Sequence, residues 1–241
     1  MYVLAINGSP HGSFGNTDLV LQNILKGMKS TGATIETVYL NKQNIKLCIG
    51  CNACWFKTPG QCIHHDDMAS LLNKLDKADL LIYATPLYVF SMTGLMKNFL
   101  DRTIPNVLPF FIENTEGNKL TTHPRRNPRT TKQKMLLVGS CAFPEEVNFA
   151  SAVQTFKYIA EVNNINYLGE IIKTASGLLR TESMRDKVAA YCDDLFIAGK
   201  ELLLQGKIDK ELTKRLRQPW LSDQDLRNIV NQRFLSVLND K

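Results

Sequence analysis

The sequence lacks any long uninterrupted apolar run. Its longest ones, LLIYA at 80–84 and MLLVG at 135–139, fall far short of the roughly 20 residues that a membrane-spanning helix needs. Its first residues, MYVLAINGSP, lack the basic start, long apolar stretch and small-residue cleavage site of a secretory signal. We therefore expect a cytoplasmic protein with no membrane partner.

The sequence also has little excess charge. Its net charge is +6 over 241 residues, and no basic patch is interleaved with stacking aromatic residues as in single-stranded nucleic-acid binders. We therefore expect no nucleic-acid partner. The hydrophobic content of 44% is high enough for a proper core, which excludes a disordered chain.

Cysteine is scarce outside one segment. Four of the six cysteines lie in CIGCNACWFKTPGQC, at Cys48, Cys51, Cys54 and Cys62. In a reducing compartment such a cluster binds metal or performs redox chemistry more often than it forms disulfides. The overlapping C-x2-C-x2-C spacing favours an iron-sulfur cluster over a structural zinc site, which usually joins two separated pairs. Zinc and free or redox-active thiols stay open as alternatives.

Short β-branched runs alternate with segments of helical periodicity along most of the chain. This alternation predicts an α/β fold in which helices cover both faces of a five-stranded parallel sheet. The expected strands are residues 2–6, 33–40, 79–85, 134–140 and 165–174. The expected helices are residues 17–30, a segment capped by Asp66, and residues 94–102, 146–162 and 182–204.

Two segments interrupt this alternation. Residues 103–133 form an insert too long for a turn, and KLTTHPRRNPRTTKQK at 119–134 has six basic residues and no acidic one. That basic segment could receive an acidic ferredoxin or the extra phosphate of NADPH, or be a solvated loop. We expect a domain at 1–204, containing a cysteine-motif loop at 47–65, and a helical extension at 205–241. The apolar face of the extension, after a cap at Ser222, would pack on its own core or on a neighbouring subunit.

Two loops predict a ligand site at the carboxyl ends of the first and third strands, where open α/β sheets bind ligands. NGSPHGSFGNT at 7–17 combines glycines with hydroxyl and amide groups before a helix, which suits a phosphate. It is neither a Walker loop nor a GxGxxG fingerprint, and an ordinary capping turn is the alternative. TPLYVFSMTG at 85–94 offers an apolar, aromatic wall for a flat ring. Together the loops favour FMN.

With CIGCNAC, GQCIHHDDM and ATPLYVFSMTGLMKNFLDR, these loops resemble the flavodoxin-like NAD(P)H-dependent FMN reductases, and especially their iron-sulfur flavoprotein branch. The resemblance covers residues 1–102 well and 134–200 loosely. It implies a flavodoxin-like three-layer sandwich and a 4Fe-4S cluster on the four cysteines. It also implies FMN contacts at three loops: Ser9, His11, Ser13, Asn16 and Thr17 at the phosphate; Pro86, Leu87, Tyr88 and Ser91 at the ring and ribityl chain; and Ser140, Cys141 and Ala142 at the ring.

We therefore expect an FMN-dependent oxidoreductase that moves electrons between a reduced donor, NAD(P)H or ferredoxin, and an acceptor through the cluster. The flavin needs no acid or base from the protein, so no catalytic side chain is assigned. The alternatives are a cluster-free NAD(P)H-dependent FMN or quinone reductase and a noncatalytic, flavodoxin-type electron carrier. The resemblance further implies a homodimer or homotetramer with the flavin near a subunit boundary.

Overall fold

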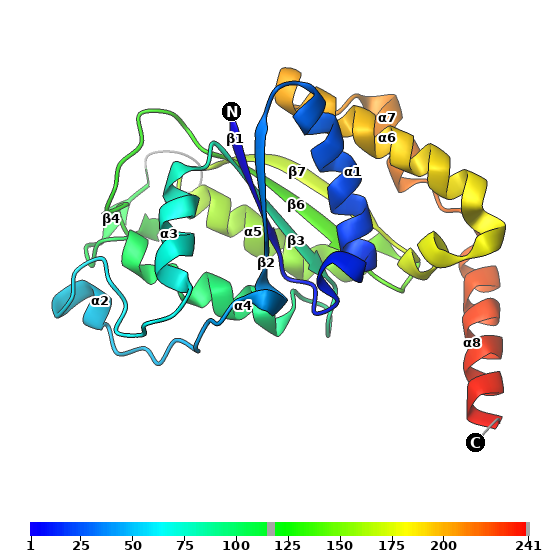
Figure 1. Ribbon diagram of the computed structural model, residues 1–241, viewed down its shortest axis with the longest axis horizontal. Helices are drawn as coiled ribbons and strands as arrows, with labels where there is room; N and C mark the ends of the chain where they lie inside the picture. The colour runs from blue at the N-terminus through cyan, green and yellow to red at the C-terminus, as the bar shows by residue number, and fades with distance from the viewer. Residues whose placement is uncertain (115–118, 240–241) are drawn as a thin grey trace.

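A five-stranded parallel sheet forms the centre of the molecule (Figure 1). The structure is a computed structural model that describes residues 1–114 and 119–239. The strand order is β2-β1-β3-β6-β7, which is the flavodoxin-like order with β1 and β3 side by side. The predicted sheet is confirmed; its strands are β1 (Tyr2–Asn7), β2 (Thr34–Tyr39), β3 (Leu80–Pro86), β6 (Lys134–Ser140) and β7 (Asn166–Lys173).

Helices cover both faces of this sheet and complete the predicted three layers (Figure 1). One face carries α1 (Asn16–Ser30), α6 (Arg185–Leu204) and α7 (Lys210–Arg217). The other face carries α3 (Met68–Lys77), α4 (Gly94–Asp101) and α5 (Ala150–Val162). Because α7 adds Leu212 and Leu216 to the core beneath α1 and α6, the first part of the C-terminal extension is integral to the fold.

The burial of β1 explains why the sequence forms this sheet. Val3 and Ala5 pack toward α1 and α6, whereas Leu4 and Ile6 pack toward α3 and α4, and all four are fully buried. Successive side chains of a strand point to opposite faces, so a strand covered on both faces needs a continuous apolar run. The run of apolar residues in β1 therefore marks a central strand.

Two glycines allow α1 and α6 to pack closely. A Cβ added at Gly27 would clash with the carbonyl oxygen of Phe196, and one added at Gly199 would clash with that of Ile24. The two helix backbones are therefore in direct contact, which brings α6 against the core under α1.

Three of the predicted helices begin later than the sequence indicated. The segments 146–162 and 182–204 open with 3-10 turns, at Glu146–Phe149 and Glu182–Met184, before α5 and α6 begin. Such tight turns are common at helix starts. The helix expected after Asp66 begins at Met68, and Asp67 occupies its N-cap position. Asp66 still accepts the amide of Met68 at 3.1 Å, but it is engaged mainly elsewhere.

The insert packs against α3 through its arginines. It contains a 3-10 turn (Ile104–Asn106) and a short antiparallel pair, β4 (Ile112–Glu113) and β5 (Thr121–Thr122); residues 115–118 lie outside the described part. Arg125 pairs with Asp76 at 3.0 Å, and Arg129 with Asp79 at 3.3 Å. These cations therefore hold the insert on the domain.

The last helix, α8 (Asp223–Asn239), extends away from the rest of the molecule (Figure 1). The predicted cap is present, because the amide of Asp225 donates to Ser222 Oγ at 3.1 Å. Leu226 is the buried residue of this helix, whereas Phe234 and Leu238 are 61% and 66% exposed. Beyond Leu226, the apolar face of α8 thus does not pack on its own core. Within residues 1–114 and 119–239, no helix has both the length and the apolar character to cross a bilayer.

Candidate functional site

The loop after β1 is braced from within. Asn7 is fully buried; its Oδ1 accepts the amide of Ser9 at 2.8 Å, and its Nδ2 donates to Asp18 Oδ1 at 2.9 Å. Gly12 adopts φ +54°, and a Cβ there would lie 2.7 Å from Asn41 Nδ2. The backbone conformation therefore favours glycine here, and a larger residue would also have to displace the exposed Asn41 side chain.

The start of α1 provides a place for an anion. The helix begins at Asn16, so the amides of Asn16 and Thr17 have no acceptor inside the helix and lie at the positive end of its dipole. Ser9 and Thr17 are buried beside them, whereas His11 and Ser13 are exposed. Free amides and hydroxyls without a neighbouring carboxylate at the loop surface fit a phosphate group.

Hydrogen bonds bring the three predicted loops together at one edge of the sheet. The hydroxyls of Thr17 and Ser140 share a hydrogen bond of 2.7 Å, which joins the start of α1 to the end of β6. The amide of Leu87 donates to the carbonyl of Ser140 at 2.9 Å. Thr93 Oγ1 donates to the carbonyl of Gly8 at 2.7 Å. Segments that lie far apart in the sequence therefore meet at one edge of the sheet.

The loop after β3 contains a strained turn. Tyr88 and Ser91 exchange backbone hydrogen bonds of 2.9 and 3.0 Å, and between them Val89 and Phe90 have φ values of +47° and +58°. Positive φ at both central residues defines a type I′ turn, which glycine and asparagine favour and a β-branched residue resists. Val89 is also 94% exposed. Strain held in an exposed apolar turn is typical of a functional site.

An apolar rim borders this turn. The rings of Phe90 and Phe143 are stacked, with centroids 6.1 Å apart and an interplanar angle of 2°. Phe90, Phe143 and Tyr88 are each about half exposed. The loop after β3 and the loop after β6 therefore contribute stacked aromatic rings beside the place where the three loops meet.

The three residues predicted at the third loop lie in different surroundings. Ser140 contacts Thr17, as described, and Ala142 is exposed. Cys141 is 5% exposed, packs with Phe149 and donates its thiol to the carbonyl of Phe143 at 3.3 Å. Burial raises the pKa of Cys141 to about 11, so its thiol is protonated at neutral pH.

Sequence reasoning missed residues that support the first loop. Arg180 donates from Nη2 to the carbonyl of Phe14 at 2.9 Å and from Nε to Asn16 Oδ1 at 3.2 Å. It ends the 3-10 helix at Ser176–Arg180, which follows β7. No local motif marks this residue, because its partners lie more than 160 positions earlier. A buried asparagine at the end of β1, Asn7, was the available signal for the bracing of the loop.

The four cysteines of the motif line one pocket, together with His64, Arg102 and the 3-10 turn of the insert. Gly50 and Asn52 have positive φ values of +64° and +53°, which turns the chain between the first three thiols. The short helix α2 (Ala53–Phe56) then carries Cys54. Burial, followed by the nearby Cys62, raises the pKa of the Cys54 thiol. The loop has therefore brought the thiols close to one another.

The pocket would have to open to admit a cluster. Its cavity is about 30 Å³, and no group of three or more cysteine, histidine or acidic side chains is arranged to hold a metal ion within the described ranges. Cys48 and Cys51 are exposed, and the intervening Ile49 is 64% exposed, so this side of the pocket is covered by little else. The donor set itself, four thiols around one cavity, fits a cluster.

A buried ion pair forms the floor of this pocket. Arg102 and Asp66 have side-chain exposures of 1% and 0%, and the two guanidinium Nη atoms reach the carboxylate at 2.8 and 3.0 Å. Burial opposes the charge of Arg102, but the hydrogen bonds that Arg102 donates to Asp66 and its interaction with Cys62 raise the pKa of the guanidinium. For Asp66, burial opposes ionisation, yet Arg102 and two backbone amides lower the pKa of the carboxyl group. The sequence indicated only the capping role of Asp66.

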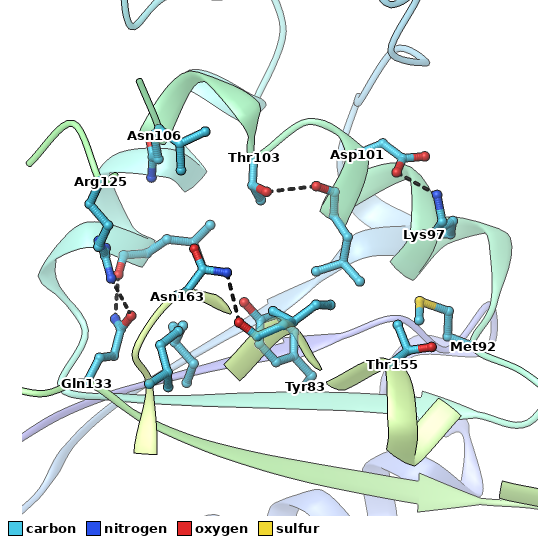
Figure 2. A pocket seen from close by; sticks show the side chains of 16 residues that line it. Tyr83, Met92, Lys97, Asp101, Thr103, Asn106, Arg125, Gln133, Thr155 and Asn163 are labelled. Carbon is cyan, nitrogen blue, oxygen red and sulfur yellow. Dashed lines mark hydrogen bonds and ion pairs between the residues drawn. The ribbon is translucent and has the colours of Figure 1, made fainter. Parts of the chain in front are cut away.

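A separate cavity of about 310 Å³ lies between α4 and α5 (Figure 2). Apolar side chains such as Leu81 and Ile159 wall it, and Tyr83 of β3 rises from its floor. At its borders Lys97 pairs with Asp101 at 2.6 Å. Met92 connects it to the loop after β3, but its lining includes no residue of the first loop or of the third. It is therefore distinct from the place where the three loops meet.

Curated relatives of this chain include iron-sulfur flavoproteins. One from Archaeoglobus fulgidus is 35% identical over 105 residues, which are 44% of this chain and 46% of the relative. One from Methanocaldococcus jannaschii is 32% identical over 127 residues, which are 53% of this chain and 64% of the relative. The chain thus spans about half to two thirds of the length of the curated relatives it matches.

Solved structures share the fold at low sequence identity. An FMN-dependent NADH-azoreductase from Bacillus anthracis, in complex with FMN, has a TM-score of 0.59 at 15% identity, covering 83% of this chain and 98% of its own. An NAD(P)H:quinone oxidoreductase from Methanothermobacter marburgensis has a TM-score of 0.58 at 15% identity, covering 84% and 97%. The model of the family described as NADPH-dependent FMN reductase matches residues 1–123, just over half of the 241 residues. With the flavodoxin-like fold and the converging loops, this match shows that the chain belongs to the NADPH-dependent FMN reductase family.

Proposed function

We propose that this protein is an FMN-dependent oxidoreductase that takes electrons from NAD(P)H or a ferredoxin and passes them to an acceptor. The observation that carries the proposal is the convergence of the three loops at one edge of the sheet, where the Thr17–Ser140 and Thr93–Gly8 hydrogen bonds hold them together. Membership of the family supports FMN as the cofactor and NADPH as a donor. The iron-sulfur flavoproteins among the relatives support electron transfer as the role.

The protein's own residues would bind and orient the cofactor. Amides at the start of α1 and the hydroxyl of Thr17 would hold the phosphate, while Arg180 fixes the loop around it. The turn at Tyr88–Ser91 and the rim of Phe90 and Phe143 would lie along the ring and exclude water from it. Bound FMN would supply the exchange of a hydride for single electrons. The protonated Cys141 thiol is neither a nucleophile nor a base at neutral pH, in keeping with catalysis by the cofactor.

FMN binding by single variants tests the first part of this proposal. Thr17→Ala removes a hydroxyl at the phosphate position, and a hydrogen bond to a charged group contributes about 1.5–3 kcal/mol. We therefore expect FMN affinity, measured by flavin fluorescence quenching, to fall at least tenfold. Thr213→Ala is the matched control, because Thr213 is a partly exposed threonine on α7 whose hydroxyl donates to the carbonyl of Asp209 at the start of the same helix. Colourless protein that folds and fails to bind added FMN would contradict the proposal.

We further propose that Cys48, Cys51, Cys54 and Cys62 hold a 4Fe-4S cluster, which would supply one-electron steps between the flavin and the acceptor. The four thiols that share one pocket and the similarity to iron-sulfur flavoproteins support this assignment. Iron and sulfide analysis of protein purified without oxygen is the test, with Cys51→Ser as the variant and Cys192→Ser as the control. About four irons per chain are expected in the wild type and control. Iron-free protein with NADPH turnover would favour a cluster-free reductase instead.

The apolar face of α8 supports self-association. Ile229, Phe234 and Leu238 are each about half exposed or more on a helix that leaves the body of the protein. We propose that this face packs on a second copy of the chain, giving a homodimer or homotetramer. Light scattering of a chain lacking residues 223–241 tests this idea. A full-length chain that is monomeric at micromolar concentration would refute it.

A further inference from the structure

Two buried nitrogen atoms beside the cysteine pocket lack hydrogen-bond partners. They are Nε of Arg102 and Nε2 of His64, and neither has an acceptor or donor among the described residues. Both residues line the same pocket as the four cysteines. Nearly all buried polar groups in folded proteins find a hydrogen-bond partner, so an unpaired one is unusual. Nε of Arg102 is a hydrogen-bond donor, and Nε2 of His64 is one when it carries the ring proton. The pocket therefore suits a group that accepts hydrogen bonds.

Arg102 is fixed in position by its other nitrogens. Its two Nη atoms bind Asp66 at 2.8 and 3.0 Å, and Nη1 also donates to the carbonyl of Lys46. With 1% of its side chain exposed, it cannot turn its remaining Nε–H toward water. The guanidinium also stays charged at any ordinary pH. A permanent cation thus lies next to the thiols, with an Nε–H that has no partner and with Cys62 close enough to interact with the guanidinium.

The chemistry of the pocket identifies the acceptor. Thiolates and the inorganic sulfides of an iron-sulfur cluster accept N–H hydrogen bonds, and such bonds and nearby charges set the reduction potential of the cluster. A cation and N–H donors favour the reduced form, because reduction adds one negative charge and forms or breaks no bond. The electron would come from FMN reduced by NAD(P)H, as in the proposed function.

We propose that Arg102 and His64 donate hydrogen bonds to sulfur atoms of a cluster held by the four cysteines, and that they raise its reduction potential. This inference rests on the proposed cluster. It assigns Arg102 two separate tasks: its Nη atoms anchor the loop through Asp66, and its Nε–H and charge act on the cluster. His64, which lines the same pocket, supports the second task.

Redox titration of the iron-loaded protein, followed by electron paramagnetic resonance, tests the inference. The variants are Arg102→Gln, Arg102→Lys and His64→Phe. Arg215→Gln is the control, because Arg215 is exposed and pairs with Asp194 of α6 on the other face of the sheet. We expect Arg102→Gln to raise the ratio of oxidised to reduced cluster at least tenfold at a fixed potential. For a one-electron couple this corresponds to lowering the reduction potential by at least about 59 mV. Arg102→Lys retains the charge and should shift it less, and His64→Phe should shift it in the same direction.

Iron and sulfide content separates the possible failures. If His64→Phe and any iron-loaded Arg102 variant keep the wild-type potential, the inference is wrong while the cluster stands. His64→Phe leaves the Arg102–Asp66 pair intact, so it gives an answer even where the Arg102 variants do not fold. If the wild type contains no iron after anaerobic purification, the inference and the proposed cluster fail together.

Discussion

Replacing Asp66 by asparagine should strongly destabilise the protein. The carboxylate accepts four hydrogen bonds, two from Arg102 and one each from the amides of Lys46 and Met68, at 2.8–3.1 Å. An asparagine keeps one acceptor oxygen and leaves the guanidinium of Arg102 buried without a counter-charge. Breaking a buried pair in this way costs about 3–5 kcal/mol, which is a large part of the stability of a typical domain.

Urea unfolding at pH 7 measures this cost, and Asp101→Asn is the control. Asp101 pairs with Lys97 at 2.6 Å, but both side chains are about half exposed, so its loss should cost only about 0.3–0.5 kcal/mol. If Asp66→Asn costs less than about 1 kcal/mol, the ion pair does not contribute as argued.

The effect of pH on the same variant follows from the lowered pKa of Asp66. The stabilisation from the ionised carboxylate is fully present above its unfolded pKa, about 3.9, and is lost as pH falls through the lower folded value. The difference in unfolding free energy between wild type and Asp66→Asn should therefore shrink in acid. A difference that stays constant from pH 7 to pH 2 would contradict the assigned charge.

Two further predictions concern the backbone. Gly199→Ala places a Cβ against the carbonyl of Ile24, and we expect a loss of about 1–3 kcal/mol in urea unfolding, whereas Gly94→Ala, with open space around it, should be close to neutral. Val89→Asn should stabilise the protein by about 1 kcal/mol, because asparagine tolerates the positive φ and the valine side chain is exposed. Val147→Asn is the control, because Val147 is exposed but lies outside the left-handed region, and it should not increase the free energy of unfolding. A decrease for Val89→Asn would contradict the argument and indicate that the valine side chain packs in the protein.

The architecture could be predicted from the sequence because its signals are local. Each strand is a short apolar run, as in Val3–Ile6, and each flanking helix has its own helical periodicity. Both kinds of element can therefore be recognised from the local sequence alone. The two ligand loops could be paired before the structure was known, since the flavodoxin-like order places β1 beside β3. The starts of α5 and α6 differed because a 3-10 turn has no separate sequence signature.

The supporting residues of the site could not be predicted in the same way. Arg102 and Asp66 lie 36 positions apart, and Arg180 lies 164 positions from Asn16, so no spacing rule connects them. The orientation of Cys141 depends on how the loop after β6 packs on Phe149. The small and apolar residues of this loop do not predict that packing. The sequence named the four cysteines, whereas only the structure places a buried cation among them.

The hydrogen bond between Thr17 and Ser140 has a consequence for how the cofactor would bind. Because this bond spans 123 positions and is buried, it holds the start of α1 against the end of β6 before any nucleotide binds. Little conformational entropy then remains to be lost on loading, which favours tight capture of the cofactor. Its release should leave the surrounding scaffold intact rather than unravel it, so that stripped protein can be refilled.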